Sequence, residues 1–310
     1  MSEPSAFPDE RLGLMFACCH PAIPRDAQLA LTLRSVAGLT TPEIARAFLV
    51  PEATIAQRIV RAKRRIVEDA IPLRVPDAHE LPDRVGEVLA VIYLLFNEGY
   101  LATSGESAAR RDLADEAEWL ASLLAKLMPD EPEVLGLLAL IRAQLARSEA
   151  RFDAAGAIVL LQAQDRTRFD RARIADAKAM LERAARMRRP GRYQLQAAIA
   201  LSHAEAPSWE ATDWPEIAGL YDALSRLDPS PVVRLNRAIA LSHVAGPAFA
   251  LEEVDRVAAD LDRYPYLHAT RAEFLRALGR VDEARTADAR ALELTSNPAE
   301  RELLLSRLAT

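Results

Sequence analysis

Glycine, cysteine and aromatic residues are all scarce in this sequence of 310 residues. Glycine occurs only 11 times while Ala, Leu and Arg dominate, which favours helices almost everywhere and predicts an all-α fold. The two cysteines, Cys18 and Cys19, are adjacent, so they cannot bridge two elements of the fold. A reduced, cytoplasmic compartment is therefore expected.

Long apolar runs and targeting signals are also absent. No stretch approaches the roughly 20 apolar residues that a membrane-spanning helix needs. The N-terminus, MSEPSAFPDE, has neither the basic n-region nor the apolar h-region of a signal peptide. We therefore expect a protein that is neither exported nor embedded in a membrane. Because no phosphate loop, catalytic triad or metal motif occurs, we expect neither an enzyme nor a bound cofactor.

The net charge of −6 hides an uneven distribution of basic residues. Residues 1–71 carry nine Lys or Arg and eight Asp or Glu, for a net charge of +1, so the remainder of the chain carries −7. Five of those nine basic residues fall between Arg58 and Arg65, with no acid among them. A basic stripe on an acidic protein is a candidate surface for nucleic acid, although solvated charge runs are also common.

A chain of this length predicts two or more domains. Residues 1–10 are polar and contain two prolines, so we expect a flexible lead. Residues 11–72 contain four segments with helical periodicity. Residues 73–129 form a helical connector domain, whose segment VLAVIYLLF is apolar nearly all round and should be buried. Residues 130–310 form a helical-repeat domain.

The most informative stretch is Gly38–Ile66, GLTTPEIARAFLVPEATIAQRIVRAKRRI. Thr40 and Glu43 have the spacing of a capping box at the start of a short helix. Pro51 breaks the chain before a second helix. The apolar stripe of that helix consists of Ile55, Ile59, Ala62 and Ile66. Two helices joined by a tight break predict a helix-turn-helix.

The polar side of the second helix is the candidate DNA-reading surface. Amide and guanidinium groups can pair with adenine and guanine edges in the major groove, and cations neutralise phosphate. The start of the preceding helix can offer backbone N–H groups to a phosphate. Val60 also lies on this side of the helix. The predicted DNA-binding residues are Thr40 and Thr41 at that start, and Ala53, Thr54, Gln57, Arg58, Arg61, Arg64 and Arg65 on the second helix. The alternative is a basic surface helix that merely solubilises the domain.

The C-terminal part of the sequence repeats itself. The hexapeptide AIALSH occurs at Ala198–His203 and again, 40 residues later, at Ala238–His243. Arg237-Ala238 recurs 34 residues later as Arg271-Ala272. A helix–turn–helix period of about 34 residues is typical of TPR repeats, and a period near 40 fits the same unit with a longer turn. Residues 299–308 are expected to form a capping helix.

Residues 150–170 interrupt this pattern. They contain a short AIVLL run preceded by turn residues, which fits either a small hairpin or an ordered loop inserted between two helices. The charged neighbours Asp165-Arg166 and Arg168-Asp170 are expected to form local ion pairs that hold the loop.

Three other clusters of reactive residue types have structural explanations. Cys18-Cys19-His20 resembles a metal site, but adjacent cysteines on a helix point about 100° apart and no second ligand pair exists, so packing is expected. Asn97-Glu98-Gly99-Tyr100 lacks a nucleophile–base pair, and Gly99 is expected to end its helix. His203 and His243 occupy equivalent positions of two repeats, which favours packing over catalysis.

Six motifs together give the sequence a specific resemblance. They are RLGLMFACCHP at 11–21, the helix-turn-helix at 38–66, LFNEGY at 95–100, LMPDEPEVLGLLAL at 127–140, QDRTRFD at 164–170 and SPVVRLNRAIAL at 230–241. The helix-turn-helix resembles region 4 of sigma-70 factors, the domain that reads the −35 promoter element. The chain as a whole resembles the extracytoplasmic-function (ECF) sigma factors that carry a long TPR-like C-terminal extension.

The resemblance implies a transcription initiation factor whose partners are promoter DNA and the RNA polymerase core. Such factors begin with region 2, which melts the −10 element, and region 2 is expected to be absent because only residues 1–10 precede region 4. A chain of this kind would bind DNA weakly and would not open a promoter. Ala56 and Gln57 stand where many relatives have Lys and Ser. The resemblance therefore does not predict which −35 sequence the chain recognises.

A second class of function is compatible with the same residues. A TPR scaffold would bind peptides, and its N-terminal domain would dock a protein rather than DNA. The acidic repeat domain suits a basic peptide, a polymerase surface or the basic stripe of its own DNA-binding domain. The last of these implies an intramolecular contact through which the repeats restrain or position region 4.

Overall fold

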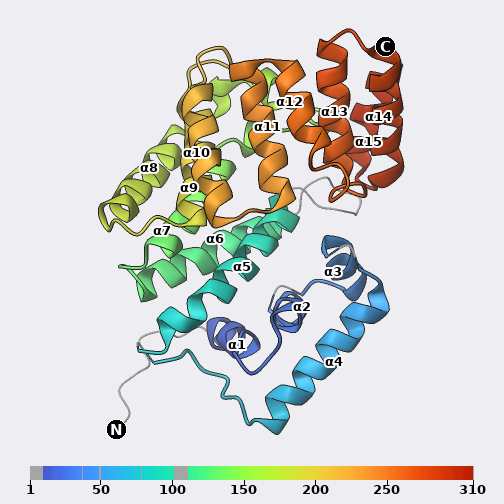
Figure 1. The fold of residues 1–310 in the computed structure, drawn as a ribbon. Helices are drawn as coiled ribbons and strands as arrows, with labels where there is room; N and C mark the ends of the chain where they lie inside the picture. Colours follow the sequence, from blue (N-terminus) through green and yellow to red (C-terminus); the bar gives the residue numbers. More distant parts are fainter. Residues whose placement is uncertain (1–9, 37, 49, 78, 101–110, 310) are drawn as a thin grey trace. The chain divides into compact units, whose positions relative to one another are not determined.

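The computed structural model is all-α and divides into two compact units, an N-terminal unit of residues 1–128 and a C-terminal unit of residues 129–310 (Figure 1). The described residues are 10–36, 38–48, 50–77, 79–100 and 111–309. Nearly all of the predicted flexible lead, residues 1–9, lies outside them. Within the described residues, the β structure consists of one isolated antiparallel bridge, between Phe152 and Ile158.

The described part of the N-terminal unit consists of helices joined by short segments. They are α1 (Glu10–Cys18), α2 (Arg25–Ser35), α3 (Thr41–Ala47), α4 (Glu52–Glu68), α5 (Leu81–Tyr100) and α6 (Arg111–Leu127). The sequence predicted a helix in each of these places. The predicted start of the last one, at residue 108, lies outside the described residues.

Helix α2 is the central helix of the helix-turn-helix region, because α1, α3, α4 and α5 all contact it. Its polar residues Gln28 and Thr32 are buried as a result. The side-chain amide of Gln28 donates to the carbonyls of His20 and Ile23, both at 2.9 Å. The hydroxyl of Thr32 donates to the carbonyl of Gln28 at 2.8 Å. These bonds fix the turn between α1 and α2 to the helix that carries the core.

Helix α5 continues through Gly99 to Tyr100, so the prediction that Gly99 ends the helix is wrong. A Cβ atom at Gly99 would lie only 2.3 Å from the backbone nitrogen of Ala114 in α6. Glycine is therefore required here for the close approach of two helices rather than for a turn. Periodicity along one helix does not show which neighbour such a glycine faces.

The C-terminal unit is a succession of helices in which each helix packs against the next (Figure 1). The helices are α7 (Pro132–Leu145), α8 (Arg171–Arg186), α9 (Arg192–Glu205), α10 (Trp214–Leu227), α11 (Pro231–Ala245), α12 (Pro247–Asp255), α13 (Pro265–Ala277), α14 (Val281–Leu294) and α15 (Pro298–Leu308). No helix in the described parts of either unit is both long enough and apolar enough to cross a membrane.

The segment between α7 and α8 is an ordered loop, which settles the choice left open by the sequence. It contains the Phe152–Ile158 bridge and three short 3₁₀ helices, η1 (Ser148–Ala150), η2 (Leu161–Ala163) and η3 (Arg166–Arg168). The ion pairs predicted inside this loop are wrong. The Asp165 carboxylate instead accepts from the N–H and the hydroxyl of Thr167, at 2.9 and 2.6 Å. Asp170 accepts from the N–H of Arg173 at 3.0 Å and so caps α8.

Arg166 attaches this loop to α9. Its side chain is buried, and Nη1 donates to the carbonyls of His203 and Ala206 at 2.6 and 2.9 Å. Nη1 of Arg171 reaches the carbonyl of Ala204 at 3.4 Å. The last carbonyls of a helix have no partner within it and carry the negative end of its dipole, so a guanidinium stabilises them. The QDRTRFD motif therefore supplies the C-terminal cap of α9.

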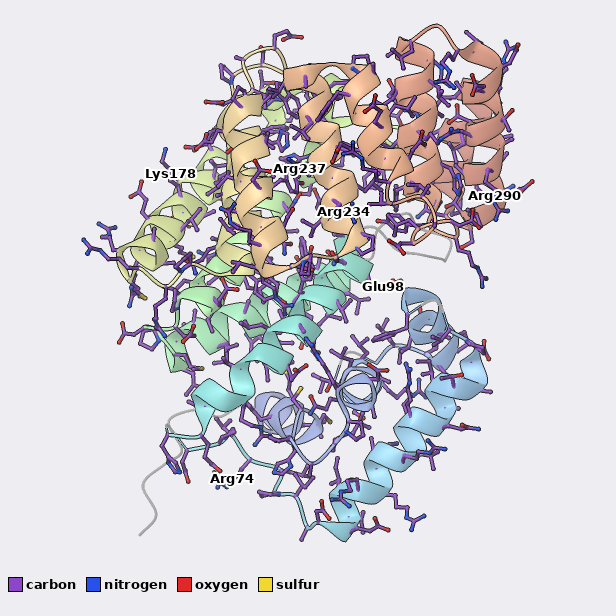
Figure 2. The ribbon with its side chains drawn as sticks, viewed as in Figure 1. Arg74, Glu98, Lys178, Arg234, Arg237 and Arg290 are labelled. Carbon is purple, nitrogen blue, oxygen red and sulfur yellow. The ribbon has the colours of Figure 1, made fainter. Side chains whose placement is uncertain are left out.

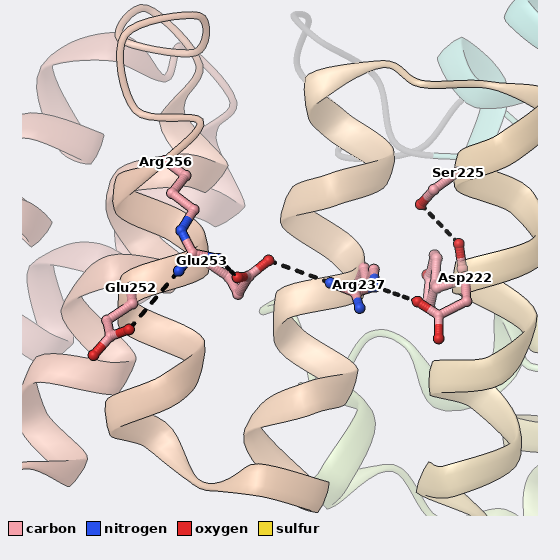
Figure 3. A network of polar contacts seen from close by, with 7 residues as sticks. Asp222, Ser225, Arg237, Glu252, Glu253 and Arg256 are labelled. Carbon is pink, nitrogen blue, oxygen red and sulfur yellow. Dashed lines mark hydrogen bonds and ion pairs between the residues drawn. The ribbon is translucent and has the colours of Figure 1, made fainter.

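Arginine also joins successive helices of the C-terminal unit. Arg237 on α11 donates to Asp222 of α10 at 2.5 Å and to Glu253 of α12 at 3.2 Å (Figure 3). Arg271 on α13 pairs with Asp255 of α12 at 2.9 Å. The Arg-Ala dipeptide that recurs in the sequence thus marks a recurring ion pair between a helix and the one before it.

Candidate DNA-binding surface

The chain enters α3 through a turn and a capping box. Gly38 has a φ of +68°, in the left-handed region that favours glycine, and lies between α2 and α3. The N–H of Thr40 donates to Oε2 of Glu43 at 2.6 Å, and the N–H of Glu43 donates to Oγ1 of Thr40 at 3.4 Å. The predicted capping box is thereby confirmed. Pro51 then precedes α4, where its missing N–H costs no helical hydrogen bond.

The apolar stripe of α4 faces the core, as its periodicity predicted. Ile55 and Ala62 are almost completely buried, Ile59 is buried, and Ile66 near the end of the helix is half-buried. Helices α1, α2 and α3 are the neighbours that α4 contacts. Because three helices hold this one face, the opposite face has a defined orientation.

The opposite face of α4 is open to solvent. We call the exposed residues Ala53, Gln57, Val60, Arg61 and Arg64 the outward surface of α4. Val60, at the middle of this surface, is 65% exposed. An amide, a β-branched apolar group and two guanidinium groups therefore stand on one side of a rigid helix, which is the set of groups that can read base edges in a major groove.

Three of the basic residues near this surface are paired with carboxylates. Arg64 pairs with Glu68 at 2.6 Å and Arg65 pairs with Asp69 at 2.7 Å, each one helical turn onward. Arg58 is less exposed than these two, and its Nη2 lies 2.9 Å from Oδ2 of Asp26 in α2. That contact holds the middle of α4 to the central helix.

Two basic residues of the same helix differ from these three. Arg61 and Lys63 are exposed and have no ion-pair partner among the described residues. The uncompensated positive charge of α4 therefore lies near its middle. The C-terminal end of the helix, where Glu68 and Asp69 lie, is close to neutral. A polyanion approaching α4 would meet the strongest positive potential at Arg61 and Lys63.

The remaining predicted residues occupy the edges of this surface. Thr54 on α4 is half-buried, and Thr41 is half-buried at the first position of α3. The N–H of Thr40 is already engaged by the Glu43 carboxylate. A phosphate at this end of α3 would have to displace that carboxylate. The role of Thr40 and Thr41 in DNA binding stays a prediction.

Comparison with known families decides what this helix-turn-helix is. Residues 14–66 match the family model for sigma-70, region 4. The helix-turn-helix is therefore similar to sigma-70 region 4. Residues 84–185 also match a family of unknown function, DUF6596, which spans parts of both units.

A relative extends the likeness beyond region 4. An uncharacterized protein of Rhizobium meliloti (strain 1021) is 51% identical over 292 residues, which cover 94% of this chain and 69% of the relative. No solved structure matches the chain. The match to region 4 suggests a role in transcription initiation and promoter binding for residues 14–66.

Sequence reasoning missed several side chains that shape the surface of region 4. The acids Glu68 and Asp69 could have been found, because they follow Arg64 and Arg65 at the i, i+4 spacing of helical ion pairs. Asp26 could not, because it lies on α2, 32 residues before its partner Arg58, and no local spacing connects them. Lys63 was left out although it shares the uncompensated charge.

The cysteines of region 4 are packing residues, as predicted. Cys18 and Cys19 are both buried and unbridged. Burial raises the pKa of Cys18 to about 11 and that of Cys19 to about 12, so both thiols stay protonated and unreactive at neutral pH. Within the part of the chain that the structure describes, no cluster of three or more His, Cys, Asp or Glu residues is placed to hold a metal ion.

The two histidines of the repeated hexapeptide also pack, as predicted. His203 and His243 both contact Trp214, with ring centroids at 5.3 Å edge-on and 3.8 Å stacked. Burial, together with the nearby guanidinium groups of Arg147 and Arg166, lowers the pKa of His203 to about 4. His203 is therefore neutral at physiological pH and acts as part of an aromatic cluster that joins α9, α10 and α11.

Proposed function

We propose that this chain is an ECF-type sigma factor whose region 4 binds the promoter −35 element through the outward surface of α4. The observation that supports the proposal is the uncompensated charge of Arg61 and Lys63 on a helix whose other face is locked into the core. A helix held in this way can enter a major groove without rearrangement.

The side chains of α4 divide into base readers and phosphate contacts. Gln57 and Arg61 are the candidates for adenine and guanine edges, and the methyl groups of Val60 suit the C5-methyl of thymine. Arg64 and Arg65 reach phosphates at the C-terminal end, where Glu68 and Asp69 weaken their attraction. Arg58, held by Asp26, orients the helix. Ala53 and Thr54 lie at the N-terminal end, where recognition helices approach bases.

The test of this function is DNA binding measured against salt. A duplex carrying candidate −35 sequences should lose affinity steeply as salt rises, because each neutralised phosphate releases counterions. Run-off transcription with core polymerase, comparing the chain with a version that carries an upstream region 2, then tests initiation. Binding that is insensitive to salt, with no transcription in either form, would contradict the proposal.

We further propose that the C-terminal unit is a TPR-like extension that makes protein contacts and restrains or positions region 4. The observation that favours this role is the charge difference between residues 1–71, at +1, and the remainder, at −7. Deleting residues 130–310 should change promoter binding or transcription. The intramolecular role fails if neither changes.

A scaffold with no direct role at DNA is the second candidate function. A groove with acidic walls in the C-terminal unit, lined by Lys178, Glu182 and Glu216 among others, favours a protein-binding role for that unit. The two candidates differ in their response to one variant. Arg61→Ala should weaken DNA binding by a sigma factor, whereas a pure scaffold would show no DNA binding to weaken.

A further inference from the structure

A groove runs between α8 and α9 in the C-terminal unit, with a volume of about 440 Å³. Both helices line it with residues spaced i, i+3, i+4 and i+7, which is one stripe of a helix. These stripes are Lys178, Leu181, Glu182 and Ala185 on α8, and Ala198, Leu201, Ser202 and Glu205 on α9. Because such a stripe is about 10 Å long, the groove matches about two turns of a peptide helix.

The floor of the groove is apolar and built from small groups. Leu201 is buried and Leu181 is half-buried between the two helices. Ala185 and Ala198 also line the groove, and because each carries only a methyl group they leave space beside the leucines. A floor of this kind accepts short aliphatic side chains, and the alanines let a ligand backbone come close.

The walls of the groove carry excess negative charge. Glu182 and Glu216 are exposed and have no ion-pair partner among the described residues. Lys178, labelled in Figure 2, is the cation that lines the groove. Glu205 neutralises it at 2.7 Å. Asp213 adds a further carboxylate, although it also caps α10 through the N–H of Glu216 at 2.9 Å.

We propose that this groove binds a basic peptide segment of a protein partner, with Lys or Arg side chains at Glu182 and Glu216 and short aliphatic side chains on Leu181 and Leu201. The proposal rests on the protein-contact role proposed for the C-terminal unit. Charge complementarity selects the occupant, because the carboxylates repel nucleic acid and acidic peptides. The apolar floor selects a peptide over a polyamine, which has no aliphatic side chains to bury.

A model peptide tests the proposal directly. The probe is a fluorescein-labelled helical peptide of Lys, Leu and Ala, with two lysines one turn apart on one face, and its binding to the full chain is followed by anisotropy. Replacing its lysines by Glu should abolish binding, and replacing its leucines by Ser should weaken it. Equal binding of the leucine-free peptide, or complete competition by spermine, would overturn the peptide assignment.

Variants of the chain locate the binding. Glu182→Gln with Glu216→Gln keeps the shape of the groove. It should lower the affinity for the probe about fivefold, since each exposed ion pair contributes roughly 0.2–1 kcal/mol. Ala185→Trp, at an exposed position, should block the groove and abolish binding. The control is Asp260→Asn with Glu302→Gln, which removes the same charge from exposed positions outside the groove. Probe binding that is equal in all three overturns the proposal.

The same samples separate this proposal from the proposed function at DNA. Binding to the −35 duplex should be unchanged in the groove variants, because none of the altered residues lies on α4. If the chain binds DNA but not the basic probe, the proposed peptide binding in the groove is refuted and the proposed function at DNA is not. A probe that binds only after residues 1–72 are deleted would show that the basic stripe of the chain itself occupies the groove, which overturns the assignment to a separate partner.

Discussion

Arginine at the helix contacts of the C-terminal unit differs from arginine on the outward surface of α4. In the C-terminal unit, Arg166 is buried as a helix cap, and Arg237 and Arg271 join neighbouring helices through carboxylates. On α4, Arg64 pairs only with an acid one turn away, and Arg61 has no ion-pair partner among the described residues. The same side chain is structural at those positions of the C-terminal unit and open to a ligand at Arg61, while Arg58 on the same helix is held by Asp26.

This difference shows that the number of basic residues does not locate a binding surface. A guanidinium between two carboxylates is already neutralised, and separating it from them costs free energy. A guanidinium without a carboxylate can neutralise a phosphate at little cost. What distinguishes α4 is therefore that Arg61 and Lys63 have no ion-pair partner among the described residues, rather than a high content of Arg.

The largest effect is expected on the stability of the C-terminal unit, when one of its structural arginines is replaced. Arg166→Met keeps the aliphatic volume but leaves two carbonyls of the α9 end without their donor, so the free energy of unfolding of the C-terminal unit should fall by about 3 kcal/mol. Urea denaturation followed by tryptophan fluorescence measures this, because Trp214 contacts His203, whose carbonyl accepts from Arg166, and Trp209 contacts Trp214. Arg168→Met, at an exposed position of the same 3₁₀ helix, is the control. Equal stability of the two variants would contradict the capping role.

The C-terminal unit should also be the acid-sensitive one. The pKa of His203 is about 4 in the folded chain, against an ordinary value of 6.5, so the unfolded chain binds a proton first as the pH falls. The stabilising contribution is complete above pH 6.5 and is lost as the pH falls toward 4, by about 2 kcal/mol.

His203→Phe removes this titration and should flatten the pH dependence of urea unfolding in that range. His79→Gln in the N-terminal unit, at an exposed position, should leave it unchanged. If His203→Phe keeps the full pH dependence of the parent chain, the buried imidazole is not its source.

A smaller effect is expected at the open arginine of α4. Arg61→Ala should weaken binding to a −35 duplex by about 1.5 kcal/mol, roughly tenfold, and reduce the salt dependence, while the free energy of unfolding stays the same. Arg226→Ala removes an exposed arginine from α10 with the same change of net charge and should leave DNA affinity nearly unchanged. Similar losses in both variants would mean that net charge, rather than the surface of α4, drives the binding.

The smallest expected effect is a gain in DNA affinity. Glu68→Gln removes the carboxylate that pairs with Arg64, so DNA affinity should rise about twofold, the size expected for an exposed ion pair. Glu302→Gln on α15 changes the net charge equally and should not raise affinity. Titrations at low and high salt measure both, and an unchanged or lower affinity for Glu68→Gln would show that Arg64 lies outside the DNA contact.

Local patterns in the sequence predicted the start of α3 and the buried face of α4. The capping box of Thr40 and Glu43 and the stripe of Ile55, Ile59 and Ala62 depend on residues within a few turns of one another, and the structure confirms both. Once the inward face of α4 is known, the period of the helix determines which residues face outward. The assignment of individual residues to DNA stays a prediction.

Tertiary packing determines which partners the charged residues find and which helix Gly99 faces. Arg166 finds its partners 37 and 40 residues away on α9, Arg58 finds Asp26 on α2, and Gly99 faces the backbone of α6. No spacing in the sequence encodes these contacts, because they depend on which helices become neighbours when their apolar faces are buried. The periodicity of apolar residues is enough to predict the helices and their inward faces. Only the packed structure determined which charges remain without a partner, since pairing requires proximity in space.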